Sequence, residues 1–213
     1  LDLFTCKKVE NFRRELNMKE GWLSRSFTAM LQNNIQVEVN SKRFLSLEID
    51  EVGAIQYSVK PINNNATIIY QPCLDSGITN KDTNWDDKFW DTLNVNHENQ
   101  QAFIQAKTMK TDFHTCTFMQ SNLFLNDNNI SIAPSVEKNE NFVSFSYEHN
   151  VNKGEVFTIN KFGGYTVDRN HDKNELVSVA KKVLKSATDI GFNGLLETQK
   201  QAWAHIWEMA DIA

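Results

Sequence analysis

Apolar and polar residues alternate along most of the chain as far as about residue 168. This period of two is typical of strands that bury one face of a sheet. The clearest segments are 22–31, 35–39, 54–59, 66–70, 113–119, 142–147 and 154–159. Stretches rich in Asn, Asp and Gly separate them, and these residues favour turns. The pattern predicts a mainly β protein, an antiparallel β-sandwich whose sheets each have one solvated face.

The period changes to that of a helix after residue 171. Apolar residues follow helical spacing over 176–187 and again over 195–210, with Gly191 between them as a stop signal. We therefore expect two C-terminal linker helices. Trp203 and Trp207 are four residues apart, so they lie along one helical face, and we interpret them as structural residues that dock the linker.

These patterns divide the chain into two parts. We expect a β-sandwich domain over residues 1–170 and a helical linker over residues 171–213. The second helix stays apolar on one side up to the end of the sequence. Because such a face requires a partner, we expect the linker to lead into a further domain.

The connection 80–90 (NKDTNWDDKFW) has neither period, yet it contains three carboxylates, two Trp, one Phe and two Asn. Long loops in compact domains are functional or disordered, and disordered segments are poor in aromatic residues. Aromatic faces beside amides and carboxylates suit sugar rings, whereas large apolar side chains also pin loops to a core or to a neighbouring domain. The candidate residues for a substrate pocket or an interface are Asn80, Asp82, Asn84, Trp85, Asp86, Phe89 and Trp90.

Composition excludes several classes of protein. The net charge is −5 and basic residues form no cluster, which argues against nucleic acid as a partner. No apolar run approaches the roughly 20 residues that span a bilayer, so we expect no membrane partner. Three scattered Cys, without a Cys-x-x-Cys or His-x-x-x-His pair, argue against a disulfide framework and against a metal site. We expect a cytoplasmic protein without a cofactor, with the periplasm as the alternative.

Four segments together resemble the N-terminal region of glycoside hydrolase family 65, the maltose, trehalose and kojibiose phosphorylases. In chain order they are 14–27 (RELNMKEGWLSRSF), 42–47 (KRFLSL), 75–90 (DSGITNKDTNWDDKFW) and 202–212 (AWAHIWEMADI). Each alone is a weak signal, but four in the family's order across nearly the whole chain are a strong one. The segment that ends in Phe89 and Trp90 resembles the corresponding motif of the maltose phosphorylase branch. Trp85 and Gln199 depart from the Tyr and His that are usual there.

The resemblance implies the N-terminal domain of a disaccharide phosphorylase. Such enzymes cleave maltose with inorganic phosphate, invert the anomeric centre, and release glucose and β-glucose 1-phosphate. Their catalytic Glu and phosphate site belong to an (α/α)6 barrel, which would follow residue 213. We therefore expect no catalytic residue in this chain, and phosphate only as a co-substrate of the longer enzyme. The implied partners are that barrel, an α-linked glucose disaccharide and a second subunit in a homodimer.

The resemblance also implies a fold of the super-β-sandwich type that lacks its first strands here, because the family's earlier Gly-Asn-Gly strand motif is missing. The domain would support the barrel, shape one wall of its substrate pocket, or form the dimer interface, where Phe and Trp are typical anchors. Clustered loop carboxylates are usually solvated, so catalysis by Asp82, Asp86, Asp87 and Glu98 is disfavoured.

Other functions stay open at this point. A β-sandwich with an aromatic loop is also typical of a free-standing carbohydrate-binding module. Within family 65, the parent enzyme is alternatively a trehalose or kojibiose phosphorylase, or a hydrolase that uses water in place of phosphate.

Overall fold

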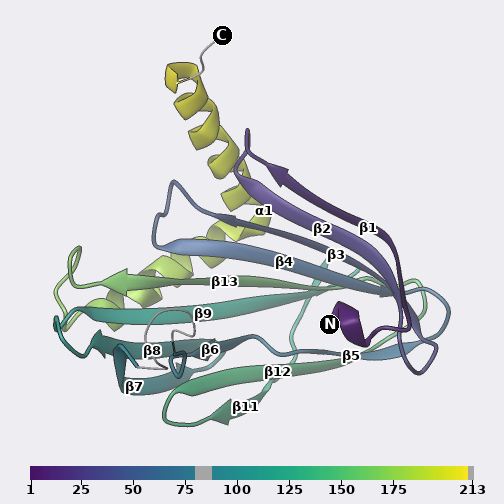
Figure 1. Cartoon of the computed structure of the whole chain (residues 1–213), viewed down its shortest axis with the longest axis horizontal. Coiled ribbons are helices and arrows are strands. Elements are labelled where there is room, and N and C mark those ends of the chain that lie inside the picture. The colour runs from purple at the N-terminus through teal and green to yellow at the C-terminus, as the bar shows by residue number, and fades with distance from the viewer. Residues whose placement is uncertain (80–87, 211–213) are drawn as a thin grey trace.

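The computed structural model describes residues 1–79 and 88–210, and the chain traced by these residues is mainly antiparallel β-sheet with a long C-terminal helix (Figure 1). The prediction of a mainly β, sandwich-like fold is confirmed. The strands are β1 (Lys8–Asn17), β2 (Trp22–Met30), β3 (Gln36–Leu45), β4 (Val52–Pro61), β5 (Ala66–Tyr70), β6 (Cys73–Asp75), β7 (Trp90–Glu98), β8 (Gln101–Thr108), β9 (His114–Leu125), β10 (Asn128–Ile130), β11 (Ser135–Lys138), β12 (Phe142–Val151) and β13 (Phe157–Val167). A short 3-10 helix, η1 (Leu3–Thr5), precedes them, and α1 (Leu176–Ala210) follows.

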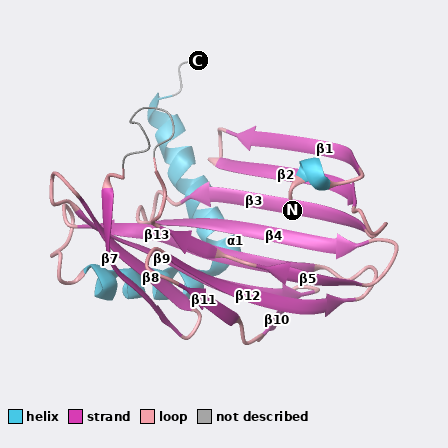
Figure 2. Cartoon of the chain, turned by 60° about the horizontal axis from the view of Figure 1, so that its bottom comes forward, coloured by secondary structure: helices cyan, strands magenta, loops and turns pink. Residues whose placement is uncertain are grey.

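Within the described residues the strands form two sheets of unequal size. The large sheet has nine strands in the order β1-β2-β3-β4-β13-β9-β8-β7, with β10 paired to β9. The small sheet has four strands in the order β11-β12-β5, with β6 also paired to β12. Figure 2 shows β5 and β12 on one side of the large sheet and α1 on the other. The molecule therefore has three layers: small sheet, large sheet and helix.

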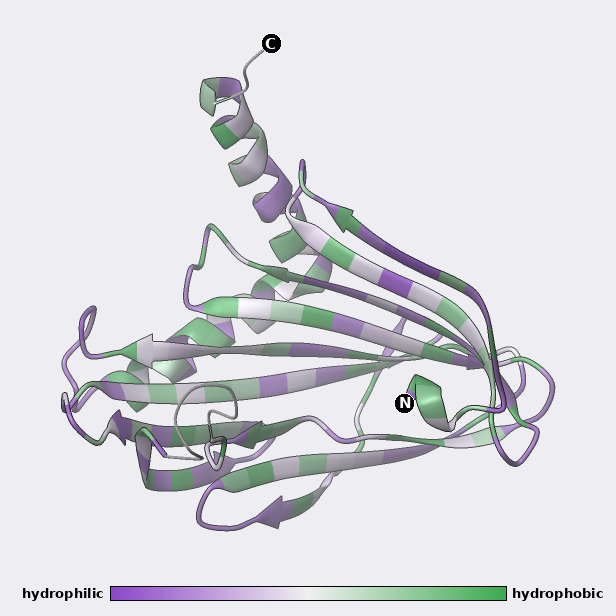
Figure 3. Ribbon diagram, in the orientation of Figure 1, coloured by the Kyte–Doolittle hydropathy of each residue, from purple (hydrophilic) through white to green (hydrophobic). Residues whose placement is uncertain are grey.

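The core between the two sheets is formed by the apolar residues of the predicted alternating strands. In β12, Val143, Phe145 and Tyr147 are at most 1 % exposed, as their shared face requires. They pack against residues of the large sheet such as Val39 and Phe157. The alternation is visible as changing bands of hydropathy along the strands (Figure 3).

The large sheet departs from the expected single solvated face. Phe118 and Met119 are adjacent in β9 and point to opposite faces, yet both are fully buried. Met119 belongs to the core between the sheets, whereas Phe118 belongs to a second core beneath α1, with Phe162 and Leu184. The prediction of one solvated face is wrong for these central strands, because the helix covers the second face.

The prediction of two C-terminal helices is also wrong, because one long helix, α1, occupies Leu176–Ala210. Gly191 does adopt a non-helical conformation, with φ +74° and ψ 170°, so it bends the helix without ending it. Glycine adopts positive φ at little cost, which allows the chain to turn here in a single residue. Phe192, Leu195 and Leu196, directly after the bend, remain in the core beneath the large sheet.

Candidate functional site

A cavity of about 790 Å³ lies where β6, β7, β8, β9 and β13 meet, on the face of the large sheet that carries the inter-sheet core. This volume is in the range of small-molecule sites. Aromatic rings and hydroxyl groups line it: Phe89, Trp90, Phe113 and Tyr165, with Ser76, Thr79, Thr115 and Thr117. Among the described residues that line it, Asp75 supplies the carboxylate. The cavity thus joins apolar ring faces to hydrogen-bonding groups, a combination suited to a sugar.

Backbone pairing positions Trp90 at this cavity. Trp90 begins β7 and pairs with Thr108 of β8, and the Phe89 carbonyl accepts a hydrogen bond from the Met109 amide at 2.9 Å. The ring centroids of Trp90 and Phe113 are 6.3 Å apart at an interplanar angle of 57°. Strand pairing therefore fixes the end of the predicted loop, and this aromatic pair forms one wall.

A polar cluster holds Ser76, which also lines the cavity. The hydroxyls of Ser76 and Thr92 lie 2.7 Å apart, and the Thr92 hydroxyl donates to Oδ1 of Asn141 at 2.7 Å. The Ser76 amide donates to the Asn141 carbonyl at 2.8 Å. These bonds tie the segment after β6 to β7 and to the turn before β12. Asn141 and Thr92 were missed in the sequence, because their partners are distant along the chain.

The structure brings together only part of the predicted loop. Phe89 and Trp90 line the cavity, whereas Asn80, Asp82, Asn84, Trp85 and Asp86 lie outside the described residues. Asp87, considered above as a carboxylate, lies outside them as well. Glu98 is at the far end of β7 and forms an ion pair with Lys181 of α1, so it does not face the cavity.

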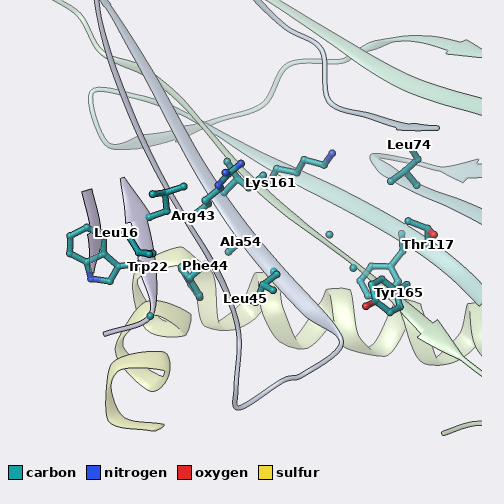
Figure 4. A pocket seen from close by; sticks show the side chains of 17 residues that line it. Leu16, Trp22, Arg43, Phe44, Leu45, Ala54, Leu74, Thr117, Lys161 and Tyr165 are labelled. Atoms are coloured by element: carbon teal, nitrogen blue, oxygen red, sulfur yellow. The ribbon is translucent and has the colours of Figure 1, made fainter. Parts of the chain in front are cut away.

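A second cavity of about 600 Å³ adjoins the first, and Leu74, Thr117 and Tyr165 line both. Figure 4 shows its side chains on β3, β4, β6 and β13, including Arg43 and Lys161. The Lys161 ammonium donates to the Cys73 carbonyl at 3.0 Å. Burial removes water from this ammonium and lowers the pKa of Lys161. The second cavity thus has two basic side chains, Arg43 and Lys161, among lining residues that are mostly apolar.

The predicted linker residues lie against the turn between β1 and β2. The rings of Trp203 and Trp207 stack with centroids 5.8 Å apart, and Nε1 of Trp207 donates to the Lys19 carbonyl at 3.0 Å. Their docking role stays a prediction. Gln199 was missed as a structural residue: its Oε1 accepts from the Leu47 amide at 2.8 Å, and it is 2 % exposed. Its helical position is apolar in character, but a polar residue occupies it because a strand-end amide needs a partner.

Within residues 1–79 and 88–210, no three His, Cys, Asp or Glu side chains converge as metal ligands would. In the same part of the chain, the helical segments lack the combination of length and hydrophobicity that a bilayer-spanning helix needs.

Comparison with known proteins decides the family. The model of the glycosyl hydrolase family 65 N-terminal domain matches residues 1–206. The chain belongs to this family. The resemblance found in the four sequence segments is thereby confirmed, and the match includes the cavity, both sheets and most of α1.

Among the proteins similar to this family 65 chain are two curated proteins and one solved structure. A maltose phosphorylase of Bacillus subtilis (strain 168) is 30 % identical over 204 residues, which are 96 % of this chain and 26 % of that protein. An alpha,alpha-trehalose phosphorylase of Thermoanaerobacter brockii is 26 % identical over 214 residues, with 96 % and 27 % covered. A putative kojibiose phosphorylase from the human microbiome superposes with a TM-score of 0.84 at 22 % identity, over 98 % of this chain and 26 % of that one. The chain thus spans about a quarter of the length of these relatives.

Proposed function

We propose that this chain is the N-terminal domain of an inverting disaccharide phosphorylase that cleaves maltose with phosphate. The proposal rests on the names of the similar curated proteins, a maltose phosphorylase and an alpha,alpha-trehalose phosphorylase, within the family whose model matches residues 1–206. The higher identity to the maltose enzyme, 30 % against 26 %, favours maltose over trehalose. The products would be glucose and β-glucose 1-phosphate.

The chemistry of the described residues supports an accessory role for the domain. Inverting glycoside cleavage needs a general acid on one side of the sugar and a nucleophile on the other. Phosphate would serve as the nucleophile, so one acid is required. Asp75, the carboxylate among the described lining residues, already accepts a hydrogen bond from the Gly77 amide at 2.8 Å. We therefore assign the acid and the phosphate ligands to the part of the parent enzyme that lies outside the matched quarter.

The domain's own contribution would be made by the aromatic cavity. Trp90 and Phe113 offer ring faces, and Thr115 and Thr117 offer hydroxyls, at the end of the segment that joins β6 to β7. We propose that this segment packs against the catalytic barrel near its mouth, where the Trp90 wall contacts substrate. Fixed backbone pairing at Trp90 would hold the ring in place without a rearrangement on binding.

The phosphorylase assignment is tested by product analysis. The full-length enzyme is incubated with maltose, trehalose or kojibiose, each with and without phosphate, and glucose 1-phosphate is measured. Phosphate-dependent product from maltose supports the proposal. Glucose without glucose 1-phosphate would make the parent a hydrolase, and product from trehalose or kojibiose alone would reassign the substrate.

The role of the aromatic wall is tested with Trp90→Ala in the full-length enzyme, with Phe4→Ala as the control. Phe4 is 99 % exposed on η1, outside both cavities. Loss of a stacking face should raise KM for maltose several-fold in Trp90→Ala and leave it unchanged in Phe4→Ala. An unchanged KM and kcat would refute substrate contact. A shift from dimer to monomer on size exclusion, with KM unchanged, would instead favour an interface role.

The second candidate function, a carbohydrate-binding module, is favoured by the cavity itself. Its volume of about 790 Å³ and its mixed aromatic and hydroxyl lining suit a sugar bound by this chain alone. Titration of the 213-residue chain with maltose, monitored by tryptophan fluorescence, tests this function. Saturable binding that Trp90→Ala abolishes would support it, and no binding up to millimolar maltose would exclude it.

A further inference from the structure

A polar groove of about 540 Å³ runs along β7, at one end of the large sheet. Residues 90–95 of β7 form one side of it, and residues 138–141, at the turn between β11 and β12, form the other. It is here named the edge groove. Within the described residues, β7 pairs with β8 and with no second strand, so the groups on its outer edge are free to bind a ligand.

The edge groove adjoins the cavity of about 790 Å³ at two places. Trp90 lines both spaces. The hydroxyl of Ser76, which lines the cavity, lies 2.7 Å from the hydroxyl of Thr92, which lines the groove. A ligand longer than the cavity would therefore reach the groove beside Trp90.

The side-chain amides of the groove are held in place, yet each keeps part of its hydrogen-bonding capacity. Oδ1 of Asn141 accepts from the Thr92 hydroxyl at 2.7 Å, and Oδ1 of Asn139 accepts from the Asn141 backbone amide at 2.9 Å. Their Nδ2 groups have no acceptor among the described residues. Nδ2 of Asn94 donates to Oε1 of Gln105 at 3.3 Å, which leaves its Oδ1 as an acceptor. Amide donors and acceptors of this kind match the hydroxyl groups of a sugar.

The charges that line the groove balance. Lys88 and Lys138 supply two positive charges, and Asp91 and Glu140 supply two negative ones. Electrostatic complementarity governs which ligands a surface selects, so a lining without net charge favours a neutral ligand over an anion or a cation.

The shape of β7 disfavours a peptide strand as the occupant. An exposed strand edge can accept a further strand, provided that its backbone groups form a regular ladder. The register of β7 against β8 shifts between Thr92 and Asn94, and such a bulge bends the strand and disrupts the ladder. Leu93, within the shift, lines the groove and is 50 % exposed, so it offers an apolar contact beside the amides. Apolar and amide groups together suit a sugar ring better than they suit a backbone.

We propose that the cavity and the edge groove together bind a neutral oligosaccharide of α-linked glucose that is longer than a disaccharide. One end of the sugar chain lies against Trp90, and the remaining units lie along β7 toward Asn94. The choice of α-linked glucose rests on the proposed function, whereas the length of the ligand follows from the groove. At about 3.4 Å per residue, β7 extends about 14 Å from Trp90 to Asn94, which gives room for further sugar units outside the cavity. Groups oriented before binding lower the entropic cost of holding them.

Calorimetric titration of the full-length protein tests the proposal, in buffer without phosphate so that no phosphorolysis occurs. Maltotetraose should bind about tenfold more tightly than maltose, which corresponds to one or two net hydrogen bonds. Asn94→Ala should remove most of this difference without changing the affinity for maltose, and Lys138→Ala should reduce the difference from the other side of the groove. Asn96→Ala is the matched control, because Asn96 is exposed on the same face of β7, two residues further on, and does not line the groove.

The other outcomes count against the proposal. Equal affinities for maltose and maltotetraose in the unmodified protein would overturn it. A difference that persists in Asn94→Ala would place the additional sugar units elsewhere in the enzyme, and an equal loss in Asn96→Ala would show an effect that is not specific to the groove. Binding of the β-linked cellotetraose as tight as that of maltotetraose would overturn the assignment to α-linked glucose.

The phosphorylase assay is scored separately from this titration. An enzyme that releases glucose 1-phosphate from maltose but binds both sugars equally would keep the proposed function and lose the inference. Tighter binding of maltotetraose that depends on Asn94, in a protein that forms no glucose 1-phosphate, would do the reverse.

Discussion

The substitution Gly21→Ala should weaken the contact between the β1–β2 turn and α1. Gly21 has φ +69°, and its amide donates to the Asn17 carbonyl at 2.9 Å. A methyl carbon on Gly21 would lie 1.8 Å from Nε1 of Trp203, far inside contact distance. The indole must therefore move, and the helix that carries it must adjust.

Two costs add at this position. A side chain in the left-handed region costs about 1–2 kcal/mol. Displacing the half-buried Trp203 ring should cost about 1–2 kcal/mol more, since full burial of a large apolar side chain contributes about 1.5–3 kcal/mol. The free energy of unfolding should therefore fall by about 2–4 kcal/mol.

Gly154→Ala is the matched control. Gly154 has φ +88°, but no atom lies within 4 Å of the position that its methyl carbon would occupy. It should lose only the conformational cost of about 1–2 kcal/mol. Equilibrium urea unfolding, followed by circular dichroism, measures both variants. Equal losses in the two would refute the steric argument.

A double-mutant cycle isolates the contact itself. If the methyl group acts through Trp203, then Trp203→Ala should cost less in the Gly21→Ala background than in the natural sequence. Additive losses would mean that the turn and the helix are independent.

Three further predictions concern buried polar groups. Gln199→Leu should cost about 1–3 kcal/mol of unfolding free energy, because it leaves the Leu47 amide without its acceptor. Gln201→Leu, on the exposed side of α1, should be near neutral. Equal urea midpoints for the two variants would contradict this prediction. The Tyr147 hydroxyl is buried without a hydrogen-bond partner among the described residues, so Tyr147→Phe should change stability by less than about 1 kcal/mol at pH 7. Burial raises the pKa of Tyr147 to about 12 from 10.0. The contribution of the neutral Tyr147 side chain to stability is therefore fully present below pH 10 and is lost as pH rises toward 12. Tyr147→Phe should make the fall in unfolding free energy between pH 10 and pH 12 shallower. Burial raises the pKa of the Cys116 thiol to about 12, so a thiol reagent at pH 8 should modify exposed Cys73 in the native protein and reach Cys116 only after unfolding; equal reaction rates would show that the second core opens readily.

The strand pattern was predictable wherever one face of a strand meets solvent. Segment 66–70 coincides with β5, and 142–147 lies within β12, because alternation survives when burial is one-sided. The strands β7 and β8 were not among the predicted segments. β8 is buried on both faces, as Phe103 and Ile104 show, so its sequence does not alternate. In β7 a shift of register between Thr92 and Asn94 interrupts the period.

The candidate site divides in a similar way. The clustering of Phe89 and Trp90 in a non-periodic segment pointed to the cavity, because exposed aromatic residues in a connection need a reason. Their neighbours Phe113, Thr115 and Tyr165 come from strands that are distant in sequence, and no local pattern relates them. The structural role of Gln199 could not be predicted for the same reason, since its Oε1 accepts from the Leu47 amide, 152 positions away.

The sequence by itself determined the class of fold, the family and the apolar face of the helix. Each of these depends on the local spacing of apolar residues or on short motifs in a fixed order, and both can be recognised in the sequence. The tertiary structure decided that Gly191 bends one helix where two were expected, because packing of Phe192 and Leu195 beneath the sheet holds the second half in the core. It also decided which surfaces remain open. Whether a strand face is covered depends on the lengths and positions of both sheets together, and a one-dimensional pattern contains neither.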